Sequence, residues 1–180
     1  MIVDLGSNIG TTVADFAQKF PNARVVGVEL DSDNLRLCLN NVAPWKDRCS
    51  VLQGAVSDTD GYCTYDRRAD SNAFTITCGS SVSEGTTMQT VKAFSLNRIF
   101  SDHLSQQPVD YLKMDIEGAE KQVLRSNTEW AQAVRCLKVE LHGDYTPEDC
   151  LHDLTVLGFH ARLDRKHPHC IVGVRRPSKH

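Results

Sequence analysis

The chain has 180 residues, 41% of them hydrophobic and 24% charged, with a formal net charge of −3 at pH 7. This length fits one domain with a single core. The slightly negative charge, and the lack of a Lys/Arg run interleaved with aromatic residues, argue against a surface for nucleic acids. No apolar stretch of the sequence approaches the roughly 20 residues needed to span a bilayer.

The first third of the chain alternates apolar runs with amphipathic helical patterns. The apolar runs predict strands of a parallel sheet covered on both faces, at residues 1–6, 23–30 and 49–56. The helical patterns are residues 11–20 and 31–42. In the second helix we expect an N-cap at Asp31 or Ser32. Its apolar contacts should come from Leu35, Leu37 and Leu39.

A different pattern begins near residue 59. Short alternating runs, separated by polar segments rich in glycine and serine, predict a β-hairpin insertion over residues 59–94 with a long loop around 79–85. The remaining expected elements are a helix at 95–104, a strand at 109–116, a helix at 119–126, a strand at 134–142, a helix at 146–159 and two strands at 160–165 and 169–176. We expect the last two strands to form an antiparallel pair.

Strands that alternate with helices predict the fold class: α/β, with a doubly wound, Rossmann-like and mostly parallel sheet. The insertion lies between the third and fourth strands of this sheet, and residues 1–180 form a single domain. With the strand order 3-2-1-4-5, the fourth and fifth strands are neighbours. Ligands of such sheets bind beyond the carboxyl ends of the strands, where the strand order reverses. The last residues of each strand are therefore candidates for the site.

The turn after the first strand, "VDLGSNIG", places Gly6 and Gly10 between a strand and a helix. The dinucleotide fingerprint has a further glycine in the middle, whereas this turn has Asn8. Close approach of a pyrophosphate is therefore disfavoured, and Asp4 at the strand end would repel it. The sulfonium and amino-acid tail of S-adenosylmethionine are compatible with such a carboxylate. The turn thus favours S-adenosylmethionine over a dinucleotide.

The ends of the second and third strands supply further candidates. Glu29 lies 23 positions after Gly6, close to the spacing of the acidic residue that binds ribose hydroxyls in nucleotide-binding βαβ units. The alternative for Glu29 is a solvated strand-end carboxylate or a helix cap. At the end of the third strand, Ala55, Val56 and Ser57 are candidates for contact with the adenine.

The stretch "YLKMDIEGAE" carries four charged residues, Lys113, Asp115, Glu117 and Glu120. Alternation along the strand places Lys113 and Asp115 on one face. Since burying an ion pair gains little net stability, a functional role at the carboxyl edge is favoured for Asp115. Carboxylates in the first turn of the next helix complement its dipole by about 0.3–1 kcal/mol each. The helix dipole suffices as an explanation of Glu120. For Glu117, both the dipole and a functional role remain as explanations.

The fifth strand ends "VELH", so that Glu140 and His142 share a face and should approach Asp115 on the neighbouring strand. His142 is therefore a candidate general base or orienting residue, the alternative being an ordinary surface histidine. His167 and His169 in "HPH" have a spacing that a metal could use, but the sequence places no further ligands near them.

With "VDLGSNIG", "VVGVELDSDN", "LQGAVSD" and "DYLKMDIEGAE" in this order, residues 2–142 resemble the FkbM family of S-adenosylmethionine-dependent methyltransferases. The most specific part, "LKMDIEGAE", is similar to the family's lysine-x-aspartate-x-glutamate-glycine signature. The resemblance implies a class I methyltransferase fold and transfer mostly to hydroxyl oxygens. It places Asp115, Glu117 and His142 near the transfer site. On the cofactor side it implies Asp4, Gly6, Asn8 and Gly10 in the loop and Glu29 at the ribose. The full set of cofactor candidates adds Ser7, Leu30, Ala55, Val56 and Asp115.

Two features differ from the family pattern. Leu30 stands where members often have proline after the strand-two glutamate. Most members also carry residues before the first strand that help to cover the cofactor, whereas here the first strand begins at residue two. We expect either that the cover comes from elsewhere or that the chain is part of a longer parent.

The expected function is S-adenosylmethionine-dependent methylation of a hydroxyl on a small molecule or sugar. The alternatives are an NAD-binding Rossmann oxidoreductase and a cofactor-binding fragment without turnover. Asp115 or His142 would remove the acceptor's proton while the other orients it. A divalent ion on Asp115, Glu117 and His142 is a less favoured route, and no metal is assigned. The insertion should face the acceptor with donors from Tyr62, Tyr65, Arg67, Arg68, Asn72, Ser80 and Ser81.

The seven cysteines are Cys38, Cys49, Cys63, Cys78, Cys136, Cys150 and Cys170. Their odd number and the lack of a C-x-x-C spacing argue against a zinc ribbon or redox pair. We expect reduced thiols, several of them buried, and a cytoplasmic location, because no signal-peptide pattern is visible. The alternative is a parent chain of the secretory pathway with one or two disulfides.

Overall fold

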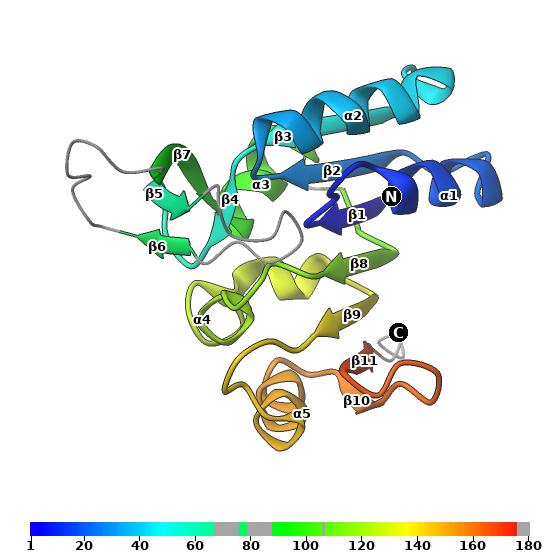
Figure 1. Cartoon of the computed structure of the whole chain (residues 1–180). Coiled ribbons are helices and arrows are strands. Elements are labelled where there is room, and N and C mark those ends of the chain that lie inside the picture. Colours follow the sequence, from blue (N-terminus) through cyan, green and yellow to red (C-terminus); the bar gives the residue numbers. More distant parts are fainter. Residues whose placement is uncertain (67–75, 79–87, 106, 176–180) are drawn as a thin grey trace.

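A seven-stranded sheet forms the centre of the computed structural model, which describes residues 1–66, 76–78, 88–105 and 107–175, with the backbone alone at 76–78. The strand order is β10-β11-β9-β8-β1-β2-β3 (Figure 1). The strands are β1 (Ile2–Leu5), β2 (Val25–Glu29), β3 (Cys49–Gln53), β8 (Tyr111–Met114), β9 (Cys136–Glu140), β10 (His160–Leu163) and β11 (Cys170–Val174). The first five of these strands are parallel, and β11 runs antiparallel to both of its neighbours. The predicted doubly wound sheet and the antiparallel pair are confirmed.

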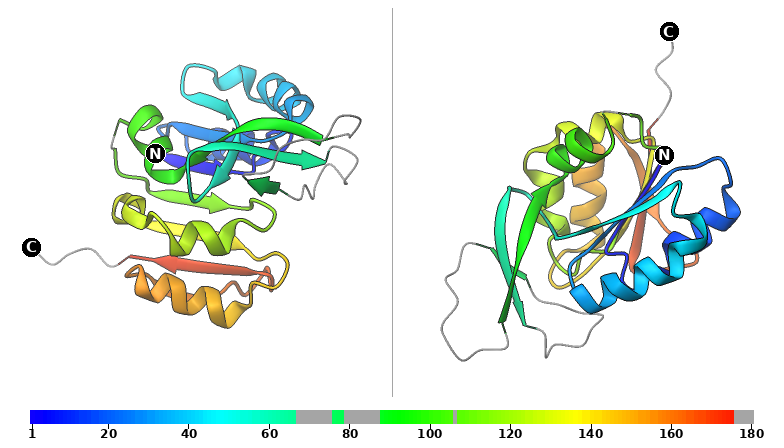
Figure 2. Two further views of the ribbon diagram at one scale, coloured as in Figure 1. Left: turned by 90° about the vertical axis from the view of Figure 1, so that its left-hand side faces the viewer. Right: turned by 90° about the horizontal axis from the view of Figure 1, so that it is seen from above.

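Helices cover both faces of this sheet. The view from above in Figure 2 shows α1 (Thr11–Lys19) and α2 (Ser32–Val42) on one face and the other α-helices on the opposite face. The helices on the opposite face are α3 (Leu96–His103), α4 (Glu120–Arg125), η2 (Thr128–Ala133) and α5 (Pro147–Val156). The short η1 (Ala43–Trp45) directly follows α2 and lies on its side of the sheet, where Trp45 packs against the same cluster as Val13. Each face has its own core: Val13 and Val25 belong to one cluster, Leu5 and Leu112 to the other. Burying each such aliphatic side chain stabilises the fold by about 1.5–3 kcal/mol.

Helix α2 begins where the sequence predicts, but it buries a different face. The Asp31 side chain accepts hydrogen bonds from the backbone N–H groups of Asp33 and Asn34, which confirms the N-cap. The prediction of an apolar face from Leu35, Leu37 and Leu39 is wrong, because alternate positions lie on opposite sides of a helix. Leu37 and Leu39 are 41% and 48% exposed. The buried face follows the i, i+4 spacing and consists of Asn34, Cys38 and Val42.

The third strand is shorter than predicted. It ends at Gln53, and Ala55–Ser57 form β4, which belongs to a second sheet with the order β4-β7-β5-β6. This sheet also contains β5 (Gly61–Asp66), β6 (Ile76–Cys78) and β7 (Met88–Ser95), and it lies to the left of the main sheet in Figure 1. A Cβ on Gly54 would lie 2.5 Å from the Phe94 ring, so glycine allows the chain to pass between the sheets. The predicted hairpin is present as β5–β6, with β7 added on the other side of β5.

The cysteines differ in part from the expectation. Cys38, Cys49, Cys136, Cys150 and Cys170 are free thiols. Cys63, however, is disulfide-bonded, and the β5–β6 register places the backbone of Cys78 directly opposite it. The expectation of reduced thiols is therefore wrong at Cys63, and the bond favours the alternative of an oxidising compartment. Within the described residues, no helix combines the length and apolarity that crossing a membrane requires.

Candidate active site

The turn between β1 and α1 lies at the point where the strand order reverses, because β2 and β8 lie on either side of β1. Gly6 and Gly10 have φ angles of 78° and 84°, and Asn8 has 49°. A Cβ on Gly6 would lie 1.7 Å from the backbone oxygen of Asp115. Only glycine therefore lets this turn pack directly on the loop that follows β8.

Ser7 and Glu29 hold this turn in place. The Ser7 hydroxyl donates to the backbone oxygen of Asp4 at 2.9 Å and is buried. The Glu29 carboxylate accepts from the backbone N–H of Asn8 at 2.7 Å and from that of Asp31 at 2.8 Å. Burial raises the pKa of Glu29. Glu29 thus links the turns after β1 and β2, so it is more than the solvated carboxylate that the sequence left open.

Leu30, Ala55 and Val56 lie where the two sheets meet. Leu30 packs against a small cluster that includes Ala55 and Tyr65. The side chains of Ala55 and Val56 are buried, and both residues pair with β7 rather than with β2. They flank the carboxyl ends of the main sheet from the smaller one.

Asp4 is a buried carboxylate without a hydrogen-bond donor. It has no exposed surface, and neither of its oxygens accepts a hydrogen bond from the described residues. Lys113 Nζ approaches its Oδ1 to 3.6 Å. Burial raises the pKa of Asp4 to about 6. An incompletely compensated carboxylate in β1, two residues before Gly6 at the start of the glycine turn, is chemically suited to a cationic ligand such as a sulfonium or an ammonium group.

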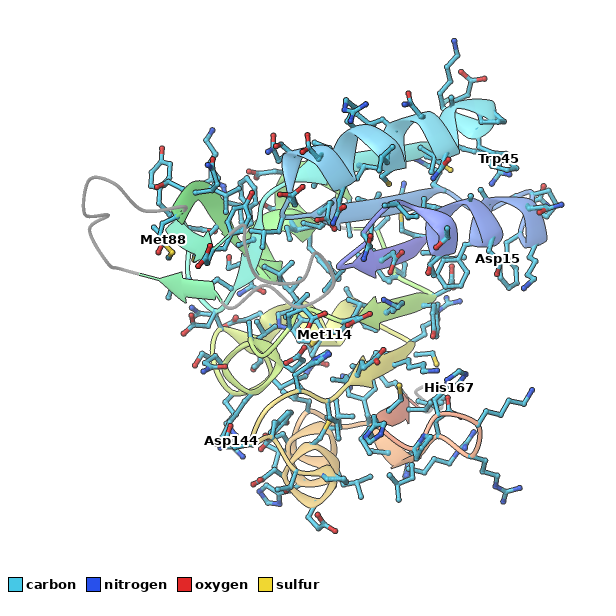
Figure 3. The ribbon with its side chains drawn as sticks, viewed as in Figure 1. Asp15, Trp45, Met88, Met114, Asp144 and His167 are labelled. Atoms are coloured by element: carbon cyan, nitrogen blue, oxygen red, sulfur yellow. The ribbon has the colours of Figure 1, made fainter. Side chains whose placement is uncertain are left out.

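Asp115 and His142 meet at the carboxyl ends of β8 and β9, as the strand pairing predicts. Asp115 follows Met114, which lies near the middle of the molecule in Figure 3. Asp115 Oδ2 accepts a hydrogen bond from Lys113 at 2.8 Å, and Oδ1 lies 3.6 Å from His142 Nε2. Glu117 Oε2 lies 3.4 Å from the same nitrogen. The structure therefore brings together all three residues expected near the transfer site.

Glu120 is the residue that the sequence interpretation missed. Its carboxylate has no exposed surface and lies 2.9 Å from His142 Nδ1. It also accepts hydrogen bonds from the backbone N–H groups of Ile116 and Gly118. The helix dipole alone is therefore an insufficient explanation of Glu120. In the sequence, Glu120 stands out only as a carboxylate three residues after Glu117 at the start of a helix. The burial of its side chain depends on how β9 packs, which the sequence pattern does not show.

The electrostatics of this cluster follow from its carboxylates. The hydrogen bond to Glu120 raises the pKa of His142 to about 9, which favours the imidazolium at neutral pH. Burial raises the pKa of Glu117. Glu117 also has a φ of 56°, a conformation that costs a non-glycine residue about 1–3 kcal/mol and that is common at functional sites.

The other sequence-predicted residues lie apart from this cluster. Tyr62 is 65% exposed, whereas Tyr65 is buried and its hydroxyl donates to Asp31 Oδ2 at 3.2 Å. His167 and His169 are exposed on the loop between β10 and β11, where Figure 3 labels His167. The expected donors that lie outside the described residues are Arg67, Arg68, Asn72, Ser80 and Ser81.

Several solved structures of similar fold are methyltransferases. Precorrin-6y C5,15-methyltransferase from Geobacter metallireducens has a TM-score of 0.57 and 8% identity, covering 97% of this chain and 79% of that one. A putative caffeoyl-CoA O-methyltransferase from Staphylococcus aureus has a TM-score of 0.57 and 7% identity, and the match covers 97% of this chain and 75% of that one. A putative tRNA methyltransferase from Streptococcus pneumoniae has a TM-score of 0.57 and 12% identity, and the match covers 100% of this chain and 65% of that one. At these identities the likeness shows the fold alone.

The sequence itself decides the family. No curated protein matches it significantly. The family model described as the methyltransferase FkbM domain, however, matches residues 4–166, which is most of the chain. This match excludes the alternative of an NAD-dependent oxidoreductase. The chain belongs to the FkbM family of methyltransferases, for which S-adenosylmethionine is the methyl donor.

Proposed function

We propose that this domain transfers a methyl group from S-adenosylmethionine to a hydroxyl oxygen of a small molecule or sugar. The observation that carries the proposal is the contact between two loops: the Gly6 turn packs on the backbone of Asp115, whose side chain faces His142. A methyl donor in the glycine turn and an acceptor beside Asp115 would then be neighbours. In-line transfer requires such a neighbourhood.

The cofactor side is proposed from the turns at the carboxyl ends of β1, β2 and β4. Asp4 offers a cationic group a carboxylate that accepts no hydrogen bond from the described residues, and Glu29 retains lone pairs for ribose hydroxyls beyond its two backbone bonds. The set is completed by Gly6, Ser7, Asn8, Gly10, Leu30, Ala55, Val56 and Asp115. When bound, S-adenosylmethionine supplies an activated methyl group on a sulfonium.

On the acceptor side, the chain must hold a hydroxyl and remove its proton. We assign the proton to Asp115 Oδ1, because both ring nitrogens of His142 already face carboxylates. His142 then orients Asp115, and Glu117 adds a second carboxylate beside the same ring nitrogen, Nε2. Residues 59–94 would supply the part of this single domain that selects the acceptor.

Two measurements test the proposal. Calorimetric titration should show binding of S-adenosylmethionine and no binding of NAD. A screen of hydroxyl-bearing acceptors, read out as S-adenosylhomocysteine, should then identify substrates. At saturating S-adenosylmethionine, the Asp115→Asn variant should lose at least about a hundredfold in turnover, the usual size of a general-base contribution.

The outcomes separate the alternatives. Binding of S-adenosylmethionine with no turnover on any acceptor would favour a cofactor-binding fragment. Full turnover by Asp115→Asn would show that Asp115 is structural. Methylation confined to nitrogen or carbon acceptors would leave the family intact and refute the oxygen assignment.

A further inference from the structure

Among the described residues, the ends of β8 and β9 carry more carboxylates than the neighbouring cations can balance. Asp115, Glu117, Glu120 and Glu140 face a single lysine, Lys113, and the His142 ring. A ligand atom from each of Asp115, Glu140 and His142 lies within 4.8 Å of the other two. Within the described part of the chain, Glu140 has neither a hydrogen-bond nor an ion-pair partner for its side chain.

We propose that Asp115 Oδ1, the Glu140 carboxylate and His142 Nε2 bind a divalent cation. Two ligands about 2.1 Å from one ion lie about 3 Å apart when adjacent and about 4.2 Å apart when opposite. The separation of 3.6 Å between Asp115 Oδ1 and His142 Nε2 lies within this range. The cation displaces the proton from Nε2, so metal binding competes with protonation of His142.

An outer carboxylate supports the histidine as a ligand. Histidines that bind metals almost always give their second ring nitrogen to a carboxylate or carbonyl, which fixes the tautomer and the ring orientation. His142 Nδ1 faces the buried Glu120 in this way, at 2.9 Å. Glu120 is itself fixed by the backbone of Ile116 and Gly118. Nε2 is thereby directed at Asp115 before any ion binds.

The two carboxylate oxygens of Asp115 contact different residues. Lys113 occupies Oδ2, which leaves Oδ1 on the side of His142. Glu140 completes the group in place of Glu117, which the sequence had suggested as the third ligand. This substitution follows from the sheet, because Glu140 is the last residue of β9 and shares a face with His142.

The ligand chemistry indicates the kind of ion. Two carboxylates and one imidazole suit Mn²⁺, and three protein ligands leave positions open for other groups. The role of the cation in the reaction rests on the proposed function, whereas the metal site itself does not. In that role, an acceptor oxygen would occupy one of the open positions. With the cation bound, Asp115 Oδ1 would serve as a ligand in place of its role as the base. The cation would then lower the pKa of the acceptor hydroxyl, whose proton would leave to water.

The test uses Mn²⁺ as the probe. The purified chain, freed of metal by chelation, is titrated with Mn²⁺, and free Mn²⁺ is measured by electron paramagnetic resonance. We expect one ion per chain. Glu140→Gln and Asp115→Asn should each weaken binding at least tenfold, and Glu120→Gln by about 10–100-fold.

The matched control is His167→Ala, which should bind Mn²⁺ like the unchanged chain. Melting of each variant without metal separates ligand loss from unfolding. Unchanged binding in both Glu140→Gln and Asp115→Asn, no binding below 1 mM, or loss only in His167→Ala would each overturn the proposal. Binding of S-adenosylmethionine is measured separately, so failure of the metal site and failure of the proposed function give different results.

Discussion

The Nδ1 atom of His142 lies 2.9 Å from Oε1 of Glu120, a carboxylate with no exposed surface. The same carboxylate accepts hydrogen bonds from the backbone N–H groups of Ile116 and Gly118. Glu120 therefore ties the loop after β8 to the residue that follows β9 by two positions. These hydrogen bonds explain the placement of Glu120 better than its position at the start of α4 does.

We predict that Glu120→Ala lowers the free energy of unfolding by about 3–5 kcal/mol, the cost of removing one partner from a buried charged pair. The variant leaves two backbone N–H groups and the His142 ring without their acceptor. A carboxylate that serves only the helix dipole is worth about 0.3–1 kcal/mol. Urea unfolding at neutral pH distinguishes these magnitudes.

Glu148 provides the matched control for this prediction. It is an exposed carboxylate in the first turn of α5, where the dipole is its only described role. Glu148→Ala should cost no more than about 1 kcal/mol. Equal, small losses in both variants would restore the dipole as the full explanation of Glu120.

The second prediction concerns the approach of the glycine turn to Asp115. In Gly6→Ala the new Cβ would meet the backbone oxygen of Asp115 at 1.7 Å, so one of the two loops must move. We expect a loss of about 3 kcal/mol or more in unfolding free energy and at least a tenfold weaker affinity for S-adenosylmethionine. Denaturant unfolding and calorimetry measure the two effects.

Gly143→Ala isolates the contribution of backbone conformation. Gly143 also has a positive φ, 64°, but nothing lies within 4 Å of the added Cβ. Its cost should be about 1–2 kcal/mol, from the left-handed conformation alone. A Gly6→Ala variant no worse than Gly143→Ala would show that the contact with Asp115 is unimportant.

Much of the fold could be predicted from periodicity, because buried parallel strands and amphipathic helices leave regular apolar patterns. The end of the third strand at Gln53 could not be predicted. Residues 49–56 form one apolar run, and only pairing with β7 draws Ala55–Ser57 into another sheet. The face of α2 was misjudged because its leucines follow a period of two within a helix.

The candidate site divides in the same way. The approach of His142 to Asp115 follows from strand register, which the sequence pattern determines. Burial of Asp4 without a hydrogen-bond donor, and of Glu120 against His142, depends on how separate elements pack. A local pattern contains no record of that packing. Glu120 was misinterpreted for this reason, because the helix dipole offered a sufficient local explanation of its carboxylate.

The last prediction follows from the buried carboxylate of Asp4. Its pKa rises from an ordinary value of 3.8 to about 6 on folding, so the folded protein holds the proton more tightly than the unfolded chain. Ionised Asp4 therefore destabilises the fold above about pH 6, by roughly 3 kcal/mol, and this cost disappears as the pH falls to about 4. Asp4→Asn should raise the melting temperature by several degrees at pH 7 and by little at pH 4.

The same variant should bind S-adenosylmethionine at least tenfold more weakly at pH 7, because the charge that costs stability is the one proposed to attract the cofactor's cationic groups. Thermal melting across pH 4–8 and calorimetry at pH 7 test the two effects together. Asp15→Asn is the control, since Asp15 is an exposed carboxylate on α1 with a surface partner in Lys19. A gain in stability with unchanged affinity would make Asp4 a structural residue, and a loss of stability at pH 7 would show that its ion pair with Lys113 outweighs the cost of burial.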